Sequence, residues 1–408
     1  MRENLLLVAI AAGVLGGGLL GWLAPEQAVK VAWLGDLFLN ALKALVLPLV
    51  FCSMIDAVTG MSGRGALGRT ARLALGYYVA TTLIAVVIGL LLVSFIRPGA
   101  GVELASGVVV ETPEAFDLST LARSLIAPNI FEAAAMFQVL PILVFGLALG
   151  AALSAVGDVA GPAIAFFRGC NAAMLRLVNW LMWTAPVGVG ALIAARLGAA
   201  GGGAAFAAEI AAIGLYCLTV ISGLLIHALV VLPLILRLFT GRSPWSYGRN
   251  LAEALMTAFS TASSSATLAV TMRLSEQRNR ISASCSRFVL PLGATVNMDG
   301  TALYEAVAAM FIAQAWGIEL TLGSQVVIVV TATLASIGAA GIPQAGLVTM
   351  VMVLEAVGLP LEGIAAILSV DWFLDRCRTT VNVWGDAVAA AVVESRTDPG
   401  VPGDIAPG

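Results

Sequence analysis

The chain contains little charge and almost no histidine. Charged residues make up 11% of its 408 residues, and His227, which lies in an apolar run, is the only histidine. A His-ligated metal site or a Ser/His/Asp triad is therefore nearly excluded. Lysine and arginine form no basic stripe, so the sequence indicates no nucleic-acid partner.

Cysteine is also scarce. The five cysteines are odd in number, scattered, and mostly in apolar surroundings. This pattern fits neither a disulfide framework nor the spacing of a metal site. We interpret them as small buried hydrophobic residues, and we expect no organic cofactor. They are Cys52, Cys170, Cys217, Cys285 and Cys377.

Apolar residues, by contrast, dominate the chain. Hydrophobic residue types make up 60% of it, and its mean hydropathy is +0.99. Repeated apolar runs of about 20 residues or more predict an all-α membrane protein that crosses the bilayer several times. The first six predicted spans lie near 4–24, 35–59, 70–96, 130–156, 165–198 and 204–240.

The pattern changes from about residue 243, where small polar or charged residues interrupt four apolar segments. Non-helical backbone at membrane depth is tolerated only where protein or water satisfies its polar groups. We therefore predict two re-entrant hairpins that alternate with two spans, each unwound at one point. This plan occurs twice, as in transporters with inverted repeats. The hairpins are segments 250–274 and 324–358, and the unwound spans are 282–316 and 362–394.

Arginine placement predicts the orientation in the membrane. Arginines flank the first, second and sixth predicted spans and follow the first hairpin, whereas segment 98–128 is mainly acidic. The positive-inside rule then places both termini and the loops 60–72 and 237–249 in the cytoplasm, and segment 98–128 outside. The tail 396–408 is expected to be disordered.

A charged stripe occupies the last apolar segment. Five polar side chains follow one another at intervals of three or four residues, so on a helix they would share one face. They are Asp371, Asp375, Arg378, Asn382 and Asp386. A guanidinium suits a carboxylate and an aspartate suits an ammonium group, so the stripe predicts a site for a zwitterion with an extra carboxylate. The alternative is a salt bridge of Arg378 with Asp375 or Asp371 that only neutralises the helix.

Asp299 and Asp386 have no equally evident arginine partner. A buried carboxylate without a partner either takes up a proton or holds a cation. Main-chain carbonyls at helix breaks near Gly293, Asn297 and Asn382 are hard oxygen ligands. Together with the carboxylates they predict a site for Na⁺. The alternative is a protonated aspartate without a ligand role.

Small polar residues mark both hairpin tips. Ser263, Ser264, Ser265 and the run 336–341 would present N–H groups and hydroxyls that can hold a carboxylate. Glu305 lies deep in the seventh span without an evident cation partner, which indicates a proton carrier. The alternative for Glu305 is a carboxylic acid hydrogen-bonded to a neighbour.

Four motifs resemble those of the dicarboxylate/amino-acid:cation symporter family, which contains glutamate transporters and neutral amino-acid exchangers. The motifs are SSSATL at 263–268, NMDGT at 297–301, ASIGAAGIP at 335–343 and the stripe at 371–386. The resemblance covers almost the whole chain. It implies the elevator-type glutamate transporter fold, with eight transmembrane helices, two re-entrant helical hairpins and inverted repeats, assembled as a homotrimer in membrane lipid.

The resemblance also implies a division into a static scaffold and a moving transport domain. The scaffold would comprise 1–69 (spans 1 and 2) and 129–200 (spans 4 and 5). The transport domain would comprise 70–97 (span 3) and 201–395 (span 6, both hairpins, spans 7 and 8). Segment 98–128 would be an outward loop and 396–408 a tail.

By position in these motifs, the resemblance assigns a substrate pocket. Arg378 would bind the side-chain carboxylate, Asp375 the ammonium group and Asn382 the main carboxylate of an acidic amino acid. The residues that complete the pocket would be Ser264, Ser265, Thr301, Gly346 and Thr379. Arg378 favours an acidic over a neutral substrate, and Asp375 favours an amino acid over a C4-dicarboxylate.

The resemblance further implies three sodium sites and two coupling residues. The first site would be formed by Gly293, Asn297, Asn382 and Asp386, the second by Tyr78, Thr81, Thr82, Asn297 and Asp299, and the third by carbonyls at Thr295, Met298, Ser336 and Ile337. Glu305 and Arg376 match animal members, in which Glu305 is tied to proton coupling and potassium is exchanged on the return step.

These observations predict a secondary active transporter, not an enzyme, that takes up glutamate or aspartate with Na⁺ and H⁺. The resemblance to the animal members implies a return of K⁺, which the sequence leaves open. A proton-only symporter and a C4-dicarboxylate or neutral amino-acid carrier of the same family remain open. A channel would need polar faces on several spans, and no nucleophile–base pair supports an enzyme. The prokaryotic length predicts the bacterial inner (plasma) membrane.

Overall fold

The computed structural model describes residues 2–61, 68–101, 125–199, 204–338, 341, 343 and 345–397. These residues form helices and connecting turns, with no β-strand among them, which confirms the predicted all-α class. The loop 62–67, most of the predicted outward segment and the tail beyond Thr397 lie outside the described residues.

In the first half of the chain, two of the predicted spans are each divided into separate helices. Its helices are α1 (Arg2–Leu23), α2 (Pro25–Lys30), α3 (Ala32–Met61), α4 (Gly68–Ile96), α6 (Ile130–Ala135), α7 (Val139–Val156), η2 (Gly157–Ala160), α8 (Gly161–Met182) and α9 (Ala185–Ala199). The prediction of one helix over 165–198 is wrong, because the backbone leaves the helix at Trp183 and Thr184. Pro186 then lies in the first turn of α9, where its missing N–H costs no helical hydrogen bond. The predicted span 130–156 is likewise divided into α6 and α7.

The second half carries the interrupted segments. Its helices are α10 (Ala204–Ile226), η3 (His227–Val231, a π-helical turn), α11 (Leu232–Thr240), α12 (Pro244–Asn250), α13 (Ala252–Thr261), α14 (Ser264–Gln277), α15 (Ala283–Val296), α16 (Asp299–Ala315), α17 (Leu322–Gly338), α18 (Ala345–Ala356), η4 (Leu361–Gly363) and α19 (Ile364–Thr397). The pairs α13–α14 and α17–α18 contact each other within each pair.

Two of the predicted helix breaks occur where small polar residues interrupt the apolar segments. The chain reverses between α13 and α14 at Ala262, whose φ of 49° is left-handed. Ser263 then caps α14 by accepting a hydrogen bond from the Ala266 N–H at 3.1 Å. The helical run of the seventh segment breaks at Asn297 and Met298, between α15 and α16.

The prediction of an unwound point in segment 362–394 is wrong, because α19 is one continuous helix. The helix contains no proline, so no backbone donor is missing inside it. The side chain of Asn382 does not compete for the backbone of α19, because its Oδ1 and Nδ2 both bond groups of α16. The carbonyl of Asn382 is therefore not available at a break.

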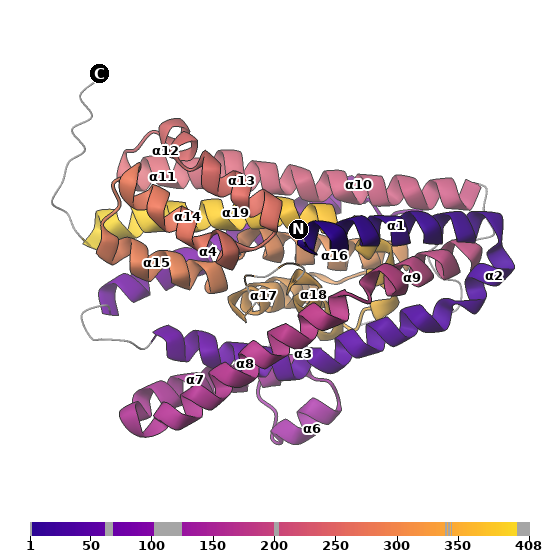
Figure 1. The fold of residues 1–408 in the computed structure, drawn as a ribbon, viewed down its shortest axis with the longest axis horizontal. Helices are drawn as coiled ribbons and strands as arrows, with labels where there is room; N and C mark the ends of the chain where they lie inside the picture. Colours follow the sequence, from indigo (N-terminus) through magenta and orange to yellow (C-terminus); the bar gives the residue numbers. More distant parts are fainter. Residues whose placement is uncertain are drawn as a thin grey trace.

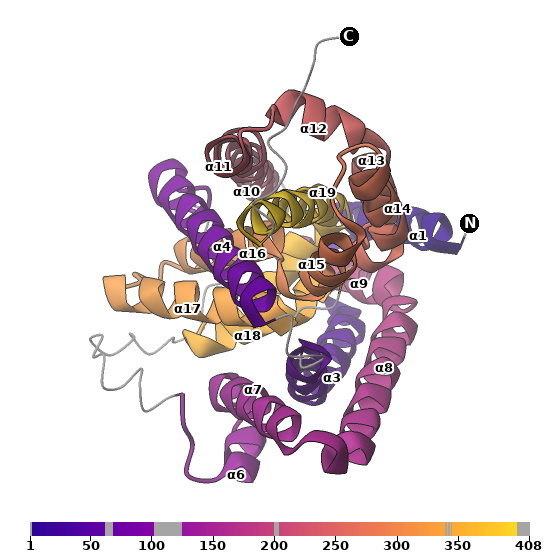
Figure 2. The ribbon, with the colours of Figure 1, turned by 90° about the vertical axis from the view of Figure 1, so that its left-hand side faces the viewer.

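Helices α16 and α19 occupy the centre of the molecule. Figure 2 shows them enclosed by α4, α10, α15, α17 and α18, with α3, α7 and α8 gathered at one side. Every side chain of α16 except that of Gln314 is buried. In Figure 1, α19 runs along the long axis beside α10 and α11, so its polar stripe extends through the interior.

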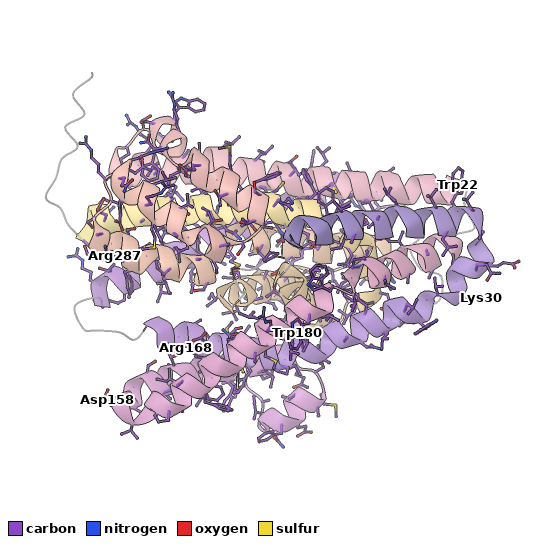
Figure 3. The ribbon with its side chains drawn as sticks, in the orientation of Figure 1. Trp22, Lys30, Asp158, Arg168, Trp180 and Arg287 are labelled. Carbon is purple, nitrogen blue, oxygen red and sulfur yellow. The ribbon has the colours of Figure 1, made fainter. Side chains whose placement is uncertain are left out.

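Several described helices have the length and composition of membrane spans. Four stretches of the described chain qualify on these two criteria. They are Pro25–Gly60, Arg69–Ile96, Pro141–Met182 and Ala211–Thr240. Shorter apolar helices include Leu322–Ile337 and Gly346–Ala356, which correspond to the two arms of the second predicted hairpin. Trp22 and Lys30 lie at the end of the molecule opposite Arg287 (Figure 3).

Candidate substrate and cation site

Arg378 is the centre of the first part of the site. Its side chain is fully buried, and its Nη2 donates to Asp375 Oδ1 at 2.8 Å. Asp371 Oδ1 lies 3.1 Å from the same nitrogen, an ion pair without hydrogen-bond geometry. The guanidinium carbon lies 3.8 Å from the centroid of the Tyr304 ring. The neutralising alternative needs a salt bridge of Arg378 with Asp375 or with Asp371, and both pairs are present.

These pairs use only one nitrogen of the guanidinium, Nη2. Nε and Nη1 of Arg378 are buried and have no hydrogen-bond partner among the described residues. Nη1 faces α18, since a Cβ placed on Gly346 would lie 3.0 Å from it. Unsatisfied N–H groups on a buried cation are costly, so internal neutralisation alone does not account for this arrangement.

Asn382 connects α19 to the start of α16. Its Oδ1 accepts from the Gly300 N–H at 2.8 Å, and its Nδ2 donates to Thr301 Oγ1 at 3.2 Å. The contact depends on glycine, because a Cβ on Gly300 would lie 2.7 Å from the Arg378 carbonyl oxygen. Thr379, which follows Arg378 on α19, is also buried. The structure thus places five of the predicted substrate residues on two contacting helices, Thr301 on α16 and Asp375, Arg378, Thr379 and Asn382 on α19.

The tips of the two hairpins contact each other. Ser263 Oγ donates to the Gly341 carbonyl at 2.6 Å, and the Ser265 N–H donates to the same oxygen at 3.1 Å. A Cβ on Gly341 would lie 2.6 Å from the Ala294 carbonyl oxygen, so the tips also approach the end of α15. Ser264 is buried at this point, whereas Ser265 is exposed. Residues 339, 340, 342 and 344 of the second tip lie outside the described residues.

Asp386 and Asn297 form the first predicted cation group. Asn297 Nδ2 donates to Asp386 Oδ1 at 2.9 Å, and both residues are buried. A Cβ on Gly293 would collide with Asp386 Oδ1 and would lie 2.9 Å from the Tyr78 hydroxyl oxygen. Glycine at 293 therefore keeps a space between α15, this carboxylate and α4. Asn382 bonds to α16, and among the described residues no hydrogen bond joins it to this group.

Asp299 is the centre of the second predicted group. Its Oδ1 accepts from Thr82 Oγ1 at 2.7 Å and from Thr81 Oγ1 at 3.2 Å. Thr81 Oγ1 also lies 3.5 Å from Asn297 Oδ1. The interpretation of Asp299 as a carboxylate without a basic partner is wrong, because His227 Nε2 lies 3.0 Å from Oδ2. Sequence spacing could not predict this pair, because 72 residues separate His227 from Asp299 along the chain.

Within the described ranges, no hydrogen bond joins the members of the third predicted group to one another, and its ligand role stays a prediction. Ser336 Oγ donates to the Thr333 carbonyl and Thr295 Oγ1 to the Leu292 carbonyl, each within its own helix. Met298 is buried just before α16, and Ile337 packs on the core from α17. Over the described ranges, no three His, Cys, Asp or Glu residues gather as a metal site. The first two groups instead combine carboxylate, amide and hydroxyl oxygens, which are the ligands of hard cations.

Glu305 and Arg376 have partners in the two hairpins. The Thr349 hydroxyl, on α18, donates to Glu305 Oε1, while Oε2 is buried without a hydrogen-bond partner among the described residues. This contact agrees with the alternative of a carboxylic acid bonded to a neighbour, and it does not test the proton-carrier prediction. Arg376 Nη1 donates to the Phe259 carbonyl at 2.8 Å, at the C-terminal end of α13.

The charges of this region define what it can bind. Around Arg378, two carboxylates face one guanidinium, which leaves one formal negative charge. Asp299 and Asp386 add two more carboxylates nearby, against a single imidazole. Buried charge of one sign is costly without compensating cations. A ligand with an ammonium group and hard monovalent cations would supply that compensation.

Comparison with known proteins agrees with this combination of helices, buried charge and oxygen ligands. The model of the sodium:dicarboxylate symporter family matches residues 6–396. The chain belongs to this family, whose members are transporters and not enzymes.

Several animal proteins are similar to the chain over most of their length. The protein glt-4 of Caenorhabditis elegans, provisionally assigned as a sodium-dependent excitatory amino acid transporter, is 40% identical over 96% of this chain and 90% of its own. Excitatory amino acid transporter 1 of Ambystoma tigrinum is 36% identical, over 97% of this chain and 83% of its own. Excitatory amino acid transporter 4 of Mus musculus is 37% identical, over 96% and 83%.

Sequence reasoning missed three members of the site. His227 was set aside because one histidine cannot form a metal cluster, although a buried polar residue in a membrane span is itself a functional signal. Tyr304 stacks on Arg378, and Thr349 bonds Glu305. Neither had a signal in the sequence, because each contact depends on how α16 and α18 pack.

Proposed function

We propose that the protein is a secondary active transporter that takes up glutamate or aspartate together with sodium. The observation that carries this proposal is the buried Arg378 guanidinium beside the carboxylate of Asp375: its Nε and Nη1 have no hydrogen-bond partner among the described residues, and its Nη1 faces Gly346. A substrate carboxylate would accept from Nη1, and the substrate ammonium group would pair with Asp375. Family membership and the names of the animal relatives support the same function.

The remaining substrate contacts follow from the polar groups around the Arg378 guanidinium. Asn382 and Thr301 would hold the main carboxylate, with Thr379, Ser264 and Ser265 completing the pocket. The contact between the hairpin tips supports this assignment, because it brings Ser264 and Ser265 close to Gly341 and the end of α15. Opening of the second tip would separate Gly341 from the first tip and admit the substrate.

Two cation sites are assigned to the oxygen-rich groups. Asp386, Asn297 and Gly293 would hold one Na⁺, with the second lone pair of the Asn382 carbonyl, which stays within the continuous α19, as a further ligand. Asp299, Thr81, Thr82, Asn297 and Tyr78 would hold a second. The convergence of hydroxyl, amide and carboxylate oxygens supports both assignments. A third site at Thr295, Met298, Ser336 and Ile337 is supported only by the resemblance of the motifs.

In the membrane, the chain would have eight spans and two re-entrant hairpins in an inverted repeat. The short paired helices α13–α14 and α17–α18 support the hairpins. The C-terminal end of α19 lies at the same end of the molecule as Arg287, which supports a cytoplasmic C-terminus (Figures 1 and 3). A bacterial plasma membrane was predicted from chain length, whereas the relatives compared above are animal proteins.

The moving parts would be those that carry the site. Contacts of α1, α2, α3, α7 and α8 with one another and with α9 support a scaffold, and contacts of α16 and α19 with α4 and α10 support a transport domain. We assign the protein to homotrimers in which each transport domain crosses the bilayer as an elevator. Glu305 would carry the coupled proton, and Arg376 would belong to the site that binds K⁺ on the return step.

Uptake into liposomes tests the proposed function. Purified protein should accumulate labelled glutamate and aspartate only when an inward sodium gradient is present, with H⁺ and K⁺ gradients varied independently. Accumulation that follows a proton gradient in sodium-free buffer would identify the proton-only symporter instead. Uptake of succinate or serine with no uptake of acidic amino acids would contradict the assigned substrate.

Gly293→Ala should weaken sodium binding. The added methyl group would displace the Asp386 carboxylate and crowd the Tyr78 hydroxyl, both of which adjoin the first cation group. Changes of residues that support a metal ligand typically cost about 10–100-fold in affinity, so the half-saturating sodium concentration of uptake should rise by about tenfold or more. Gly214→Ala is the matched control, since a Cβ there meets no atom within 4 Å. An unchanged sodium dependence in Gly293→Ala would remove Asp386 from the cation site.

A further inference from the structure

His227 lies in the one irregular turn of the long α10–α11 run described by the structure. The π-helical turn His227–Val231 separates the two helices. Pro233, in the first turn of α11, has no N–H to donate to the carbonyl one turn earlier, which explains why regular bonding fails here. The Trp384 indole N–H, from α19, donates to the Ala228 carbonyl within this turn at 3.0 Å. Such π-turns often occur at functional sites.

The turn directs His227 to one oxygen of Asp299. Nε2 lies 3.0 Å from Oδ2, and both side chains are fully buried. The other oxygen, Oδ1, receives the hydroxyls of Thr81 and Thr82. The two oxygens therefore have separate roles, one facing α10 and one facing the group assigned to sodium.

We infer that His227 is a positioning residue of the second cation site. Its Nε2–H holds Oδ2 of Asp299, which fixes the carboxylate so that Oδ1 stays with Thr81, Thr82 and the adjacent Asn297 amide oxygen. Hydrogen bonds from outer residues to a ligating carboxylate set its orientation and the affinity for the metal ion. This inference rests on the proposed function, because it concerns the cation that the transporter would carry.

The contact has a competing explanation as a packing contact between α10 and α16. A packing role and a positioning role make different predictions for the empty and sodium-loaded protein. If His227 only joins two helices, its ring should be indifferent to sodium. If it holds the ligand carboxylate, binding of a cation at Oδ1 should change the electron density on the carboxylate and hence the hydrogen bond to Nε2.

The wild-type protein offers a direct test, because His227 is the only histidine in the chain. Protein labelled with ¹⁵N-histidine, and purified with a tag free of histidine, gives ring-nitrogen signals from this residue alone. We expect a protonated Nε2 whose resonance shifts on addition of sodium chloride and not of choline chloride. The half-saturating sodium concentration of that shift should equal the one for thermal stabilisation of the protein by sodium.

Variants test the same inference through affinity. His227→Leu removes the donor, and His227→Gln retains an amide N–H. Sodium-dependent stabilisation, measured without amino acid, should need about 10–100-fold more sodium in His227→Leu than in the wild type, and Gln should recover part of the loss. Thr219→Val is the control on α10, because its buried hydroxyl donates to the Leu215 carbonyl of the same helix and, among the described residues, to no other group. It should leave sodium affinity unchanged.

The outcomes separate this inference from the proposed function. A histidine signal that ignores sodium in wild-type protein that sodium does stabilise would overturn the positioning role and leave sodium transport intact. The same holds for a folded His227→Leu protein with wild-type sodium affinity. Should His227→Leu fail to fold, the spectrum of the wild type decides alone. Wild-type protein that sodium neither stabilises nor drives in uptake would instead refute the proposed function.

Discussion

Replacing Arg378 with cysteine should abolish uptake of acidic amino acids and permit transport of small neutral ones. The guanidinium is the one cation that the described residues place against Asp371 and Asp375, and its Nη1 faces Gly346. Cysteine would remove the group that receives the side-chain carboxylate. A neutral amino acid needs no such partner, and its ammonium group would still meet Asp375. Loss of one partner from a buried, hydrogen-bonded charge pair typically costs about 2–5 kcal/mol or more, which is roughly 30- to several-thousand-fold in affinity.

The measurement is uptake of labelled glutamate, aspartate and serine into liposomes by equal amounts of folded protein. Arg168→Cys is the matched control, because Arg168 lies on α8, 63% exposed, and pairs only loosely with Asp56 at 3.4 Å. An exposed pair of this kind contributes little, so this control should transport glutamate normally. Arg378→Lys adds a finer test, since lysine keeps the charge and loses the planar fork. It should retain weaker acidic amino-acid uptake than the wild type.

Glutamate uptake that survives Arg378→Cys would show that the two salt bridges only neutralise α19. That alternative already accounts for Nη2, which both aspartates approach. It does not account for Nε and Nη1, which are buried without hydrogen-bond partners among the described residues. The substrate binding proposed here gives Nη1 a partner, so the variant distinguishes the two explanations at an atom on which they differ.

Charge balance explains why substrate and sodium would bind together. The region around Arg378 carries one formal negative charge, and an acidic amino acid brings another. Asp386 and Asp299 lie on the same two central helices as this region. Sodium at these carboxylates would offset the accumulated charge at low dielectric, where the interaction is strong. Loading of the ions and of the substrate would therefore support each other without a direct contact.

The sequence predicted those features that local chemistry determines. Polar residues within apolar segments predicted the reversal at Ala262 and Ser263 and the break at Asn297, because backbone inside a membrane protein leaves the helix only where other groups satisfy it. The helical period placed Asp375 and Arg378 on one face, and the structure shows them hydrogen-bonded. These predictions needed only spacing along a single element.

The errors arose where distant elements meet. The amide of Asn382 was interpreted as a sign of unwinding, yet it reaches across to Gly300 and Thr301 while α19 continues. His227 was dismissed, yet the packing of α10 on α16 brings it to Asp299. A polar residue in an apolar segment therefore signals a partner, but the spacing along one segment does not identify which helix supplies it.

Glu305→Gln should reduce net glutamate uptake by about tenfold or more and leave exchange of external for internal glutamate largely intact. Glu305 is fully buried on α16, and Thr349 of the second hairpin donates to its Oε1. Glutamine keeps an oxygen for that hydroxyl and resembles the protonated acid, so the loaded transporter should still cross the membrane. It cannot release a proton, and so the return step without substrate should become limiting. Loss of a general acid–base group typically slows the step that needs it by about 10²–10⁴-fold. A tenfold fall in the rate of net uptake is therefore the smallest effect that we expect.

Both activities are measured in the same liposomes, first with empty interiors and then with unlabelled glutamate inside. Glu362→Gln is the matched control, because Glu362 is exposed in the short turn η4 before α19. It should leave net uptake and exchange unchanged. Thr349→Val provides a second arm, since it removes the hydroxyl that joins Glu305 to α18 and leaves the carboxyl able to titrate. If Glu305→Gln reduced uptake and exchange equally, and Thr349→Val did the same, Glu305 would be a structural contact of the second hairpin and the proton would have to travel by another group.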